Sequence, residues 1–575
     1  MKKLYYVMLF IGVFWGKAQQ NPILQYRLNK SINWENLIEQ YKKLDGEFPQ
    51  AKLIEAGKTD CGRPLHLFII DMDMEFSPEK AHFRNKIVML VNNGIHPGEP
   101  CGIDASLKLA NDILHDKSKL KTLKNTVLCI IPVYNVDGSA NRGCCSRANQ
   151  NGPEEYGFRG NARNLDLNRD FIKMDTENTR SFIRIFQNWK PHLFVDTHTT
   201  NGADYPYVMT LITTQRDKLA TPLGDYTYNT LEPELYARME NRKYPMCPYM
   251  NTLGKTPESG IAAFLETPRY STGYAALFHT IGFVTEAHML KPFKQRVEAT
   301  YAFLDELLDL ANIERKNILK AKQEAEIYTA KQTYLPINWE LDTTIVSQFM
   351  FNGYTSDYKI SSISGLPILY YDQTQSWKKD VKFFTRYNII DSVVVPHFYI
   401  VPQAWKEVVQ RLQENQIEMK PLLTDTLITA WFEYIGQVKT VGSPYEGHFL
   451  HQEVVTELRG GEPVSFFKGD WVISTDQLAR KFIVETLEPR AIDSYFRWNF
   501  YDEILQQKEW FSDYVFEQTA MLLLEDNPDL KAALQKQQKE DESFAKSHFQ
   551  QLYFIYKHSP YYEKNHRRYP VGKVF

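Results

Sequence analysis

Cysteine is scarce in this sequence, with six residues among 575. Six cysteines are too few to stabilise a chain of this length by disulfides in the way that small secreted domains are stabilised. Cys144 and Cys145 are adjacent, which is too close for an ordinary disulfide between them. The six cysteines also do not show zinc-finger spacing, so a structural zinc module of that kind is not expected.

The net charge is also small, at −3, so the chain does not have the excess of basic residues that is typical of a nucleic-acid-binding protein. We therefore expect no nucleic-acid partner. Hydrophobic residues make up 43% of the chain, which is enough to bury large cores, and the length predicts two or three domains. Beyond the N-terminus no apolar run is long enough to cross a bilayer, so we expect no membrane span in the mature chain.

The N-terminus has the pattern of an export signal. Lys2 and Lys3 precede an apolar run over residues 4–15, and small residues follow at Gly16 and Ala18. This pattern predicts a signal peptide at residues 1–18, with cleavage after Ala18 and a periplasmic or extracellular location. No cysteine directly follows the apolar run, so a lipoprotein anchor is not expected.

Strands alternate with helices over roughly residues 32–310, which predicts an α/β fold. We expect a mixed, mostly buried β-sheet flanked by helices. The predicted helices span residues 32–48, 103–114, 177–189 and 293–310, and the predicted strands span residues 65–71, 86–92, 126–134, 192–196, 208–213 and 282–288. The segment Tyr334-Leu335-Pro336 follows a charged helix and predicts a domain boundary. The sequence thus divides into an N-terminal domain at 19–332 and an α+β accessory region of unknown role at 333–575.

One apolar run ends in a potential metal site. Residues 88–91 have strand character, Gly94 follows in a turn, and His96 and Glu99 come next, three positions apart. Sites in open α/β sheets form in the loops beyond the carboxyl ends of the strands. An imidazole nitrogen and a carboxylate oxygen are good zinc donors, and a catalytic zinc takes three protein ligands. A third ligand must therefore come from elsewhere in the chain.

Several motifs, in a fixed order, resemble those of the zinc carboxypeptidases of the carboxypeptidase A-like (funnelin) family. They are Gly62-Arg63-Pro64, His96-Pro97-Gly98-Glu99, Asp166-Leu167-Asn168-Arg169, His198 after a strand and Glu286 after a later strand. The resemblance covers roughly residues 32–310 and implies that the domain at 19–332 is the catalytic domain. It implies a zinc carboxypeptidase-like fold in which Zn²⁺ is held by His96, Glu99 and His198. It also implies that Glu286 is the general base and that Asp166 orients a ligand histidine.

The same resemblance implies how a substrate would bind. Asn168 and Arg169 match the pair that grips a terminal carboxylate, a task that suits the planar fork of arginine. Arg159 is the favoured oxyanion-stabilising arginine, and Arg163 competes for that role. The tyrosine of the family's flexible loop has two possible matches, Tyr270 and Tyr274.

The predicted function is that of a secreted zinc metallocarboxypeptidase acting on peptides with a free C-terminal carboxylate. The alternative is a zinc amidase or deacylase that uses the same site on amino-acid conjugates or cell-wall peptides. The sequence Asp196-Thr197-His198-Thr199 has some similarity to the aspartoacylase-like branch of the superfamily. A third possibility, a binding protein that kept the fold without catalysis, would normally have lost Glu286 or a ligand, and none is lost.

Overall fold

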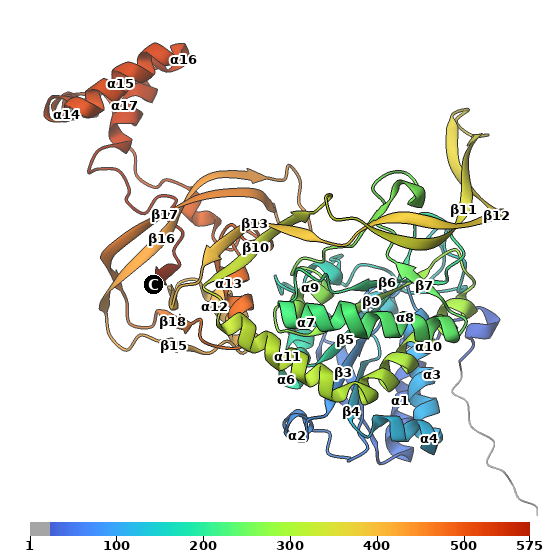
Figure 1. The fold of residues 1–575 in the computed structure, drawn as a ribbon. Coiled ribbons are helices and arrows are strands. Elements are labelled where there is room, and N and C mark those ends of the chain that lie inside the picture. The colour runs from blue at the N-terminus through green and yellow to red at the C-terminus, as the bar shows by residue number, and fades with distance from the viewer. Residues whose placement is uncertain (1–23) are drawn as a thin grey trace, which may run out of the picture. The chain divides into compact units, whose positions relative to one another are not determined.

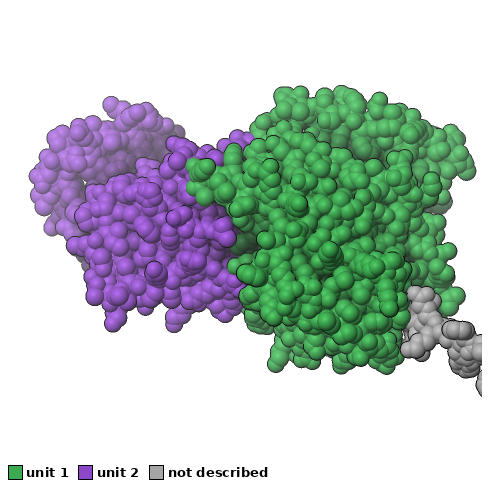
Figure 2. Space-filling view, turned by 60° about the horizontal axis from the view of Figure 1, so that its bottom comes forward, with its two compact units in different colours: residues 1–331, 340–388 green, residues 332–339, 389–575 purple. Residues whose placement is uncertain are grey.

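The structure, a computed structural model, describes residues 24–575, so the predicted signal peptide lies outside the described residues. The chain forms two compact units (Figure 2). Unit 1 contains the chain through Lys331 together with Glu340–Asn388, and unit 2 contains Gln332–Trp339 and Ile389–Phe575. The assignment of a catalytic domain to 19–332 and an accessory region to 333–575 stays a prediction, because compactness alone does not assign a role.

Unit 1 is built on an eight-stranded mixed sheet with the order β1-β2-β4-β3-β5-β9-β6-β7 (Figure 1). Strands β4, β3, β5 and β9 are parallel to one another, and β6 pairs antiparallel with β9. The strands are β1 (Ala51–Lys58), β2 (Pro64–Ile70), β3 (Ile87–Asn92), β4 (Thr126–Ile131), β5 (Leu193–Thr200), β6 (Met209–Thr213), β7 (Met246–Pro248) and β9 (Ile281–His288).

Helices cover both faces of this sheet. The helices of unit 1 are α1 (Trp34–Glu47), α2 (Pro78–Phe83), α3 (Cys101–His115), α4 (Lys117–Leu120), α5 (Val136–Ala140), α6 (Glu177–Trp189), α7 (Thr221–Tyr226), α8 (Glu232–Asn241), α9 (Ser271–Ala276), α10 (Phe293–Ile313) and α11 (Arg315–Ala330). Successive side chains of a strand point to opposite faces. On one face Val91 and Val195 join a core with residues of α1, α3 and α10. On the other face Phe194 packs edge-on against Phe182 of α6, with ring centroids 5.7 Å apart. The structure thus confirms the mixed, mostly buried sheet flanked by helices.

A second, smaller sheet of unit 1 was not predicted from the sequence. Strands β11 (Ser347–Ile360) and β12 (Pro367–Phe384) form a long antiparallel hairpin, and β12 also pairs in parallel with β8 (Ile261–Ala262). Most side chains of the hairpin are partly or fully exposed. The hairpin escapes prediction because a strand with little buried surface lacks the apolar alternation that marks a strand in sequence.

Unit 2 contains a six-stranded sheet with the order β15-β18-β14-β19-β16-β17, which agrees with the α+β character expected for residues 333–575. Its strands are β14 (Phe398–Val401), β15 (Met419–Pro421), β16 (Thr426–Thr440), β17 (His451–Phe466), β18 (Trp471–Ser474) and β19 (Gly572–Val574). A two-stranded sheet pairs β10 (Tyr334–Leu341) with β13 (Tyr387–Val394). The helices of unit 2 are α12 (Lys406–Glu414), α13 (Arg480–Leu487), α14 (Asp513–Asp526), α15 (Pro528–Glu540), α16 (Glu542–Ala545) and α17 (His548–Lys557). The last four of these helices share a small hydrophobic core.

One expectation about the cysteines is wrong. Cys144 and Cys145 form a disulfide although they are adjacent in sequence. The pairing is accompanied by a left-handed φ of 81° at Cys145, a conformation uncommon outside glycine. Among the helices of residues 24–575, no helix is long and apolar enough to span a membrane.

Candidate metal centre

The loop after β3 carries two of the predicted ligands. Strand β3 is buried along its whole length, and the chain then turns at Gly94, whose φ of 64° lies in the left-handed region that favours glycine. The turn places His96 and Glu99 ahead of α3, and both side chains are about 3% exposed. Gly102 lets the first turn of α3 lie against β5, since a Cβ there would come within 2.0 Å of Thr197 Oγ1. The loop is therefore pressed against the strand that carries the third predicted ligand.

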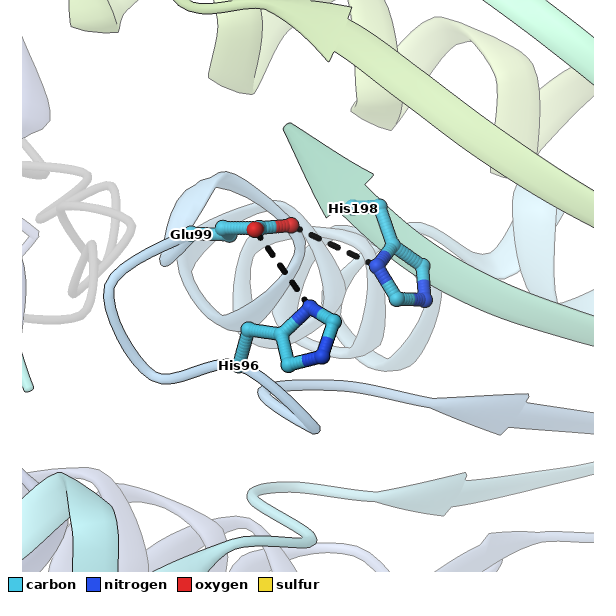
Figure 3. A group of neighbouring side chains, drawn as sticks. All are labelled: His96, Glu99 and His198. Carbon is cyan, nitrogen blue, oxygen red and sulfur yellow. Dashed lines mark ion pairs between the residues drawn. The ribbon is translucent and has the colours of Figure 1, made fainter. Parts of the chain in front are cut away.

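His198, on β5, completes a cluster with the loop residues (Figure 3). The Nδ1 atom of His96 lies 3.3 Å from Glu99 Oε1, and the Nδ1 atom of His198 lies 3.3 Å from Glu99 Oε2. One potential ligand atom from each residue lies within 4.8 Å of the other two. Two imidazoles and one carboxylate match the donor set of a catalytic zinc, which keeps a further position for water. The residues present therefore fit a zinc ion.

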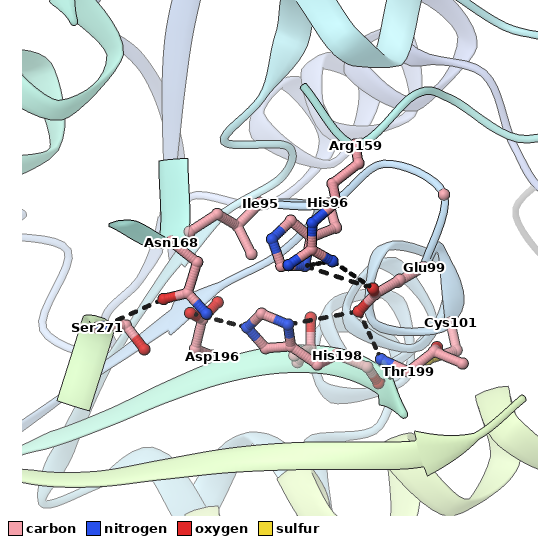
Figure 4. A network of polar contacts seen from close by, with 12 residues as sticks. Ile95, His96, Glu99, Cys101, Arg159, Asn168, Asp196, His198, Thr199 and Ser271 are labelled. Carbon is pink, nitrogen blue, oxygen red and sulfur yellow. Dashed lines mark hydrogen bonds and ion pairs between the residues drawn. The ribbon is translucent and has the colours of Figure 1, made fainter. Parts of the chain in front are cut away.

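A second group of residues orients the two histidines, and Figure 4 shows two of them, Arg159 beside His96 and Asp196 beside His198. His96 Nε2 lies 2.9 Å from Oδ1 of Asp166, the carboxylate to which the resemblance assigns an orienting role. Arg159 Nη1 lies 3.2 Å from His96 Nδ1. Arginine can only donate, so Nδ1 accepts and the proton of the neutral ring sits on Nε2, facing Asp166. This tautomer leaves Nδ1 with the lone pair that a metal would need.

Asp196 holds the second histidine and was not singled out from the sequence as an orienting residue. Its Oδ2 lies 3.1 Å from His198 Nε2, and Asn92 donates to its Oδ1 at 3.0 Å. The signal that could have found it is its position on the same strand, two residues before His198, so that both side chains point to one face.

The charges of the cluster favour a cation. Burial would raise the pKa of Glu99, but Arg147 and the neighbouring imidazoles hold that pKa well below its ordinary value. Burial would lower the pKa of His198, but the Asp196 carboxylate raises it well above its ordinary value. For Asp166, burial is likewise outweighed by His96 and the nearby arginines, and its pKa is lowered. Glu99 and Asp166 are therefore carboxylates, the form in which Glu99 can bind a metal.

Glu286 lies beside the cluster on the neighbouring strand. It faces His198 in the register of β5 and β9. Burial, reinforced by the negative charge of Glu99, raises its pKa to about 8. A carboxylate with this pKa can take up and release a proton near neutral pH.

The predicted site residues meet in one cavity of about 270 Å³. Those that line it are His96, Glu99, Arg159, Asn168, Arg169, His198, Tyr270 and Glu286. Asn168 is held by the amide of Ser271, which donates to its Oδ1 at 3.3 Å. The guanidinium of Arg169 lies 4.4 Å from the centre of the Tyr270 ring, a cation–π arrangement. The structure thus brings the predicted carboxylate-binding pair into the same cavity as the metal centre.

The two competing tyrosines lie in different surroundings. Tyr270 lines the cavity, whereas Tyr274 is fully buried and its hydroxyl accepts from Gln187 at 2.8 Å. The Tyr274 ring packs against Phe186 and Phe278, with centroids 5.2 Å away in each case. The structure therefore places Tyr274 in an aromatic core, away from the cavity lining.

The structure also distinguishes the two candidate arginines, Arg159 and Arg163. Arg159 lines the cavity and donates twice to Asp166 Oδ2, at 2.8 and 3.1 Å. Arg163 instead donates to the backbone carbonyl of Asp175. Arg147, which the sequence did not single out, also lines the cavity, where it donates to Glu99 Oε1 at 2.6 Å and to the Thr199 carbonyl at 2.8 Å. No regular spacing links Arg147 to the other motifs, so the sequence offered no signal for it.

Sequence comparison with known proteins identifies a family for the segment that carries most of the site. Residues 37–218 match the model of the zinc carboxypeptidase family. Carboxypeptidase 2 of Trichophyton tonsurans is 30% identical over 143 residues, which are 24% of this chain and 23% of that protein. Carboxypeptidase 2 of Trichophyton rubrum is 29% identical over 146 residues, which are 25% of this chain and 24% of that protein. The chain therefore covers about a quarter of the length of these curated relatives.

Among solved structures, carboxypeptidase A from Helicoverpa armigera is 16% identical, with a TM-score of 0.36, and the match covers 52% of this chain and 75% of that chain. A metallo-carboxypeptidase from Pseudomonas aeruginosa is 14% identical, with a TM-score of 0.37, over 50% of this chain and 70% of that chain. The family match includes His96, Glu99, Asp166, Asn168, Arg169 and His198. Residues 37–218, which contain these six side chains, thus match the zinc carboxypeptidase family.

Proposed function

We propose that the chain is an exported zinc metallocarboxypeptidase that hydrolyses the last peptide bond of peptides with a free C-terminal carboxylate. The observation that carries this proposal is a single cavity that contains both a three-residue metal cluster and the Asn168–Arg169 pair. His96, Glu99 and His198 would hold the zinc. When bound, a zinc ion lowers the pKa of water and polarises a carbonyl group.

Glu286 moves the proton in this proposal. Its carboxylate accepts a proton from the attacking water and passes it to the nitrogen of the leaving amine. Two features support this role, its position opposite His198 and the burial that raises its pKa. A buried base is also shielded from bulk water, which would otherwise compete for the proton.

Asn168 and Arg169 bind the terminal carboxylate of the substrate, and Tyr270 covers the same part of the cavity. Arg169 is restrained on two sides, because its Nη1 donates to the Asn168 carbonyl at 2.8 Å and its plane lies over the Tyr270 ring. A guanidinium fixed in this way loses little conformational entropy when a carboxylate docks. Tyr274, from its buried position, would support this wall without touching the substrate.

Arg159 stabilises the negative charge that develops on the scissile carbonyl oxygen. Its side chain is 45% exposed and reaches the metal cluster, which supports this role. Arg147 is a second candidate, because it also donates into the cluster from a more buried position, at 17% exposure. Both arginines reach Glu99 from the cavity wall, and a pair of variants separates their roles.

The direct test of the proposal uses the purified protein, zinc and a mixed set of peptides with free C-termini, with products identified by mass spectrometry. Stepwise loss of single C-terminal residues supports the carboxypeptidase assignment. Release of acyl groups or amide nitrogen from blocked conjugates, without loss of C-terminal residues, would instead assign a zinc amidase or deacylase to the same site.

A further inference from the structure

Glu266 is a buried carboxylate that the proposed chemistry does not use. It lies in the segment before α9, is 5% exposed and lines the same cavity as the metal cluster. Its Oε2 accepts two hydrogen bonds from Thr272, one from the backbone N–H at 3.0 Å and one from the hydroxyl. Among the described residues, no hydrogen bond reaches its Oε1 and no cationic side chain forms an ion pair with it. The second oxygen therefore has no partner among the described residues, and it belongs to a side chain that lines the cavity.

A buried carboxylate without a cation is uncommon, because removing its charge from water is costly. Of the other carboxylates at or beside this cavity, Glu286 is the base of the proposed function, and the remaining two are paired with arginines. Glu99 is bonded to Arg147 at 2.6 Å and Asp166 to Arg159 at 2.8 Å. Burial also raises the pKa of Glu266. Glu266 thus has the surroundings of a residue that awaits a positive charge from outside the chain.

The position of Glu266 suits contact with the substrate's last side chain. The amide of Ser271 binds Asn168, and the amide of the next residue, Thr272, binds Glu266. Both cavity residues therefore converge on the first turn of α9. The carboxylate and the side chain of a C-terminal residue branch from the same carbon atom, so a group close to the carboxylate-binding pair meets that side chain.

Part of the remaining wall fits the stem of a long side chain. Ile212, Tyr249 and Phe264 line the cavity along with Glu266. Lysine and arginine bury their methylene stems against apolar surface and keep the charged end on a polar group. The three apolar side chains and the Glu266 carboxylate together are complementary to that shape.

We infer that Glu266 binds the cationic side chain of a C-terminal lysine or arginine, which makes the site selective for peptides with a basic last residue. This inference rests on the proposed carboxypeptidase function and names its substrate class.

The test compares peptides that are identical except for a last residue of lysine, arginine, leucine or phenylalanine. With the wild-type protein, kcat/KM for the basic pair should exceed that for the neutral pair by roughly 30-fold or more, as expected for a buried charge pair. Glu266→Gln keeps the acceptor for Thr272 but removes the charge. It should lower kcat/KM for the basic peptides by a similar factor and leave the neutral peptides nearly unchanged.

Glu232→Gln is the matched control. Glu232 also accepts from a threonine hydroxyl, that of Thr213, but it lines a neighbouring cavity, so its variant should keep the basic preference. A further measurement uses the wild type alone, so it does not depend on how a variant folds. In it, free arginine should inhibit cleavage of the leucine peptide more strongly than free leucine does.

Two results would overturn the inference while leaving the carboxypeptidase assignment intact. One is equal or better cleavage of the neutral peptides by the wild type. The other is an equal loss for basic and neutral peptides in Glu266→Gln. Failure of the wild type to cleave any of the four peptides would instead overturn the proposed function.

Discussion

His198 and Glu286 face each other on the neighbouring parallel strands β5 and β9. One is a predicted metal ligand and the other the predicted base, so the sheet itself fixes the distance between the two functions. Because the two side chains belong to different strands, either can be changed without moving the other. The metal centre and the proton transfer are therefore separable by mutation.

Glu286→Gln should bind zinc normally but turn over roughly 100-fold more slowly or worse, because the amide preserves shape but cannot accept a proton. Metal analysis and steady-state kinetics on the same preparation measure both quantities. Turnover close to that of the wild type would reassign the base to another group.

His198→Ala should lose zinc and activity together, since only His96 and Glu99 would remain as ligands. Asp196→Asn should have a graded effect, because it weakens the interaction that orients His198 but keeps the ligand. We expect roughly a 10- to 100-fold loss of zinc affinity, measured by competition with a chelator. Full zinc occupancy in His198→Ala would place the third ligand elsewhere.

Arg159→Ala should lower kcat by roughly 100-fold with zinc retained, because a donor to the developing oxyanion acts mainly in the transition state. Arg147→Ala serves as the comparison, since both side chains line the cavity and contact Glu99. If only Arg147→Ala shows the loss in kcat, the oxyanion role belongs to Arg147.

Glu232→Gln should stabilise the protein at alkaline pH. Burial raises the pKa of Glu232 from 4.5 to about 7, so the folded wild type loses stability as pH rises through that range. The glutamine variant does not titrate there. The two proteins should have similar melting temperatures at about pH 5, and the variant should gain on the order of 2 kcal/mol at about pH 8. Glu234→Gln, an exposed change on the same helix, should show no such pH-dependent difference. A gain at pH 5 as large as that at pH 8 would contradict this account.

Local pattern was enough to predict much of the site. His96 and Glu99 are three residues apart after an apolar strand, and Asn168 and Arg169 are adjacent, so short motifs contain both pairs. The helix at 177–189 and the central strands were also predicted, because each buries a continuous or regularly spaced set of apolar side chains. Each of these features depends only on residues that are close together in the sequence.

Other features depend on the packing of distant segments, and sequence pattern did not contain them. Arg147 and Glu266 lie in irregular segments, and only the folded chain shows that both line the cavity. Tyr270 and Tyr274 are one helical turn apart, and burial alone distinguishes them. Strand β1 went unpredicted because most of its side chains are exposed or only partly buried, which weakens its apolar alternation.

The central claim is that Asn168 and Arg169 hold a free C-terminal carboxylate beside the metal centre. Its most direct test compares kcat/KM for one peptide as the free acid and as the C-terminal amide, in the wild type and in Arg169→Ala. Removing a charge-assisted hydrogen bond inside a site costs on the order of 2–4 kcal/mol, so the wild type should prefer the acid by roughly 30- to 1000-fold. Arg169→Ala should erase most of that preference by slowing the acid, and Arg169→Lys should restore little of it, because an ammonium cannot reproduce the fork. Equal cleavage of acid and amide by the wild type would contradict the carboxypeptidase assignment and favour an amidase at the same site.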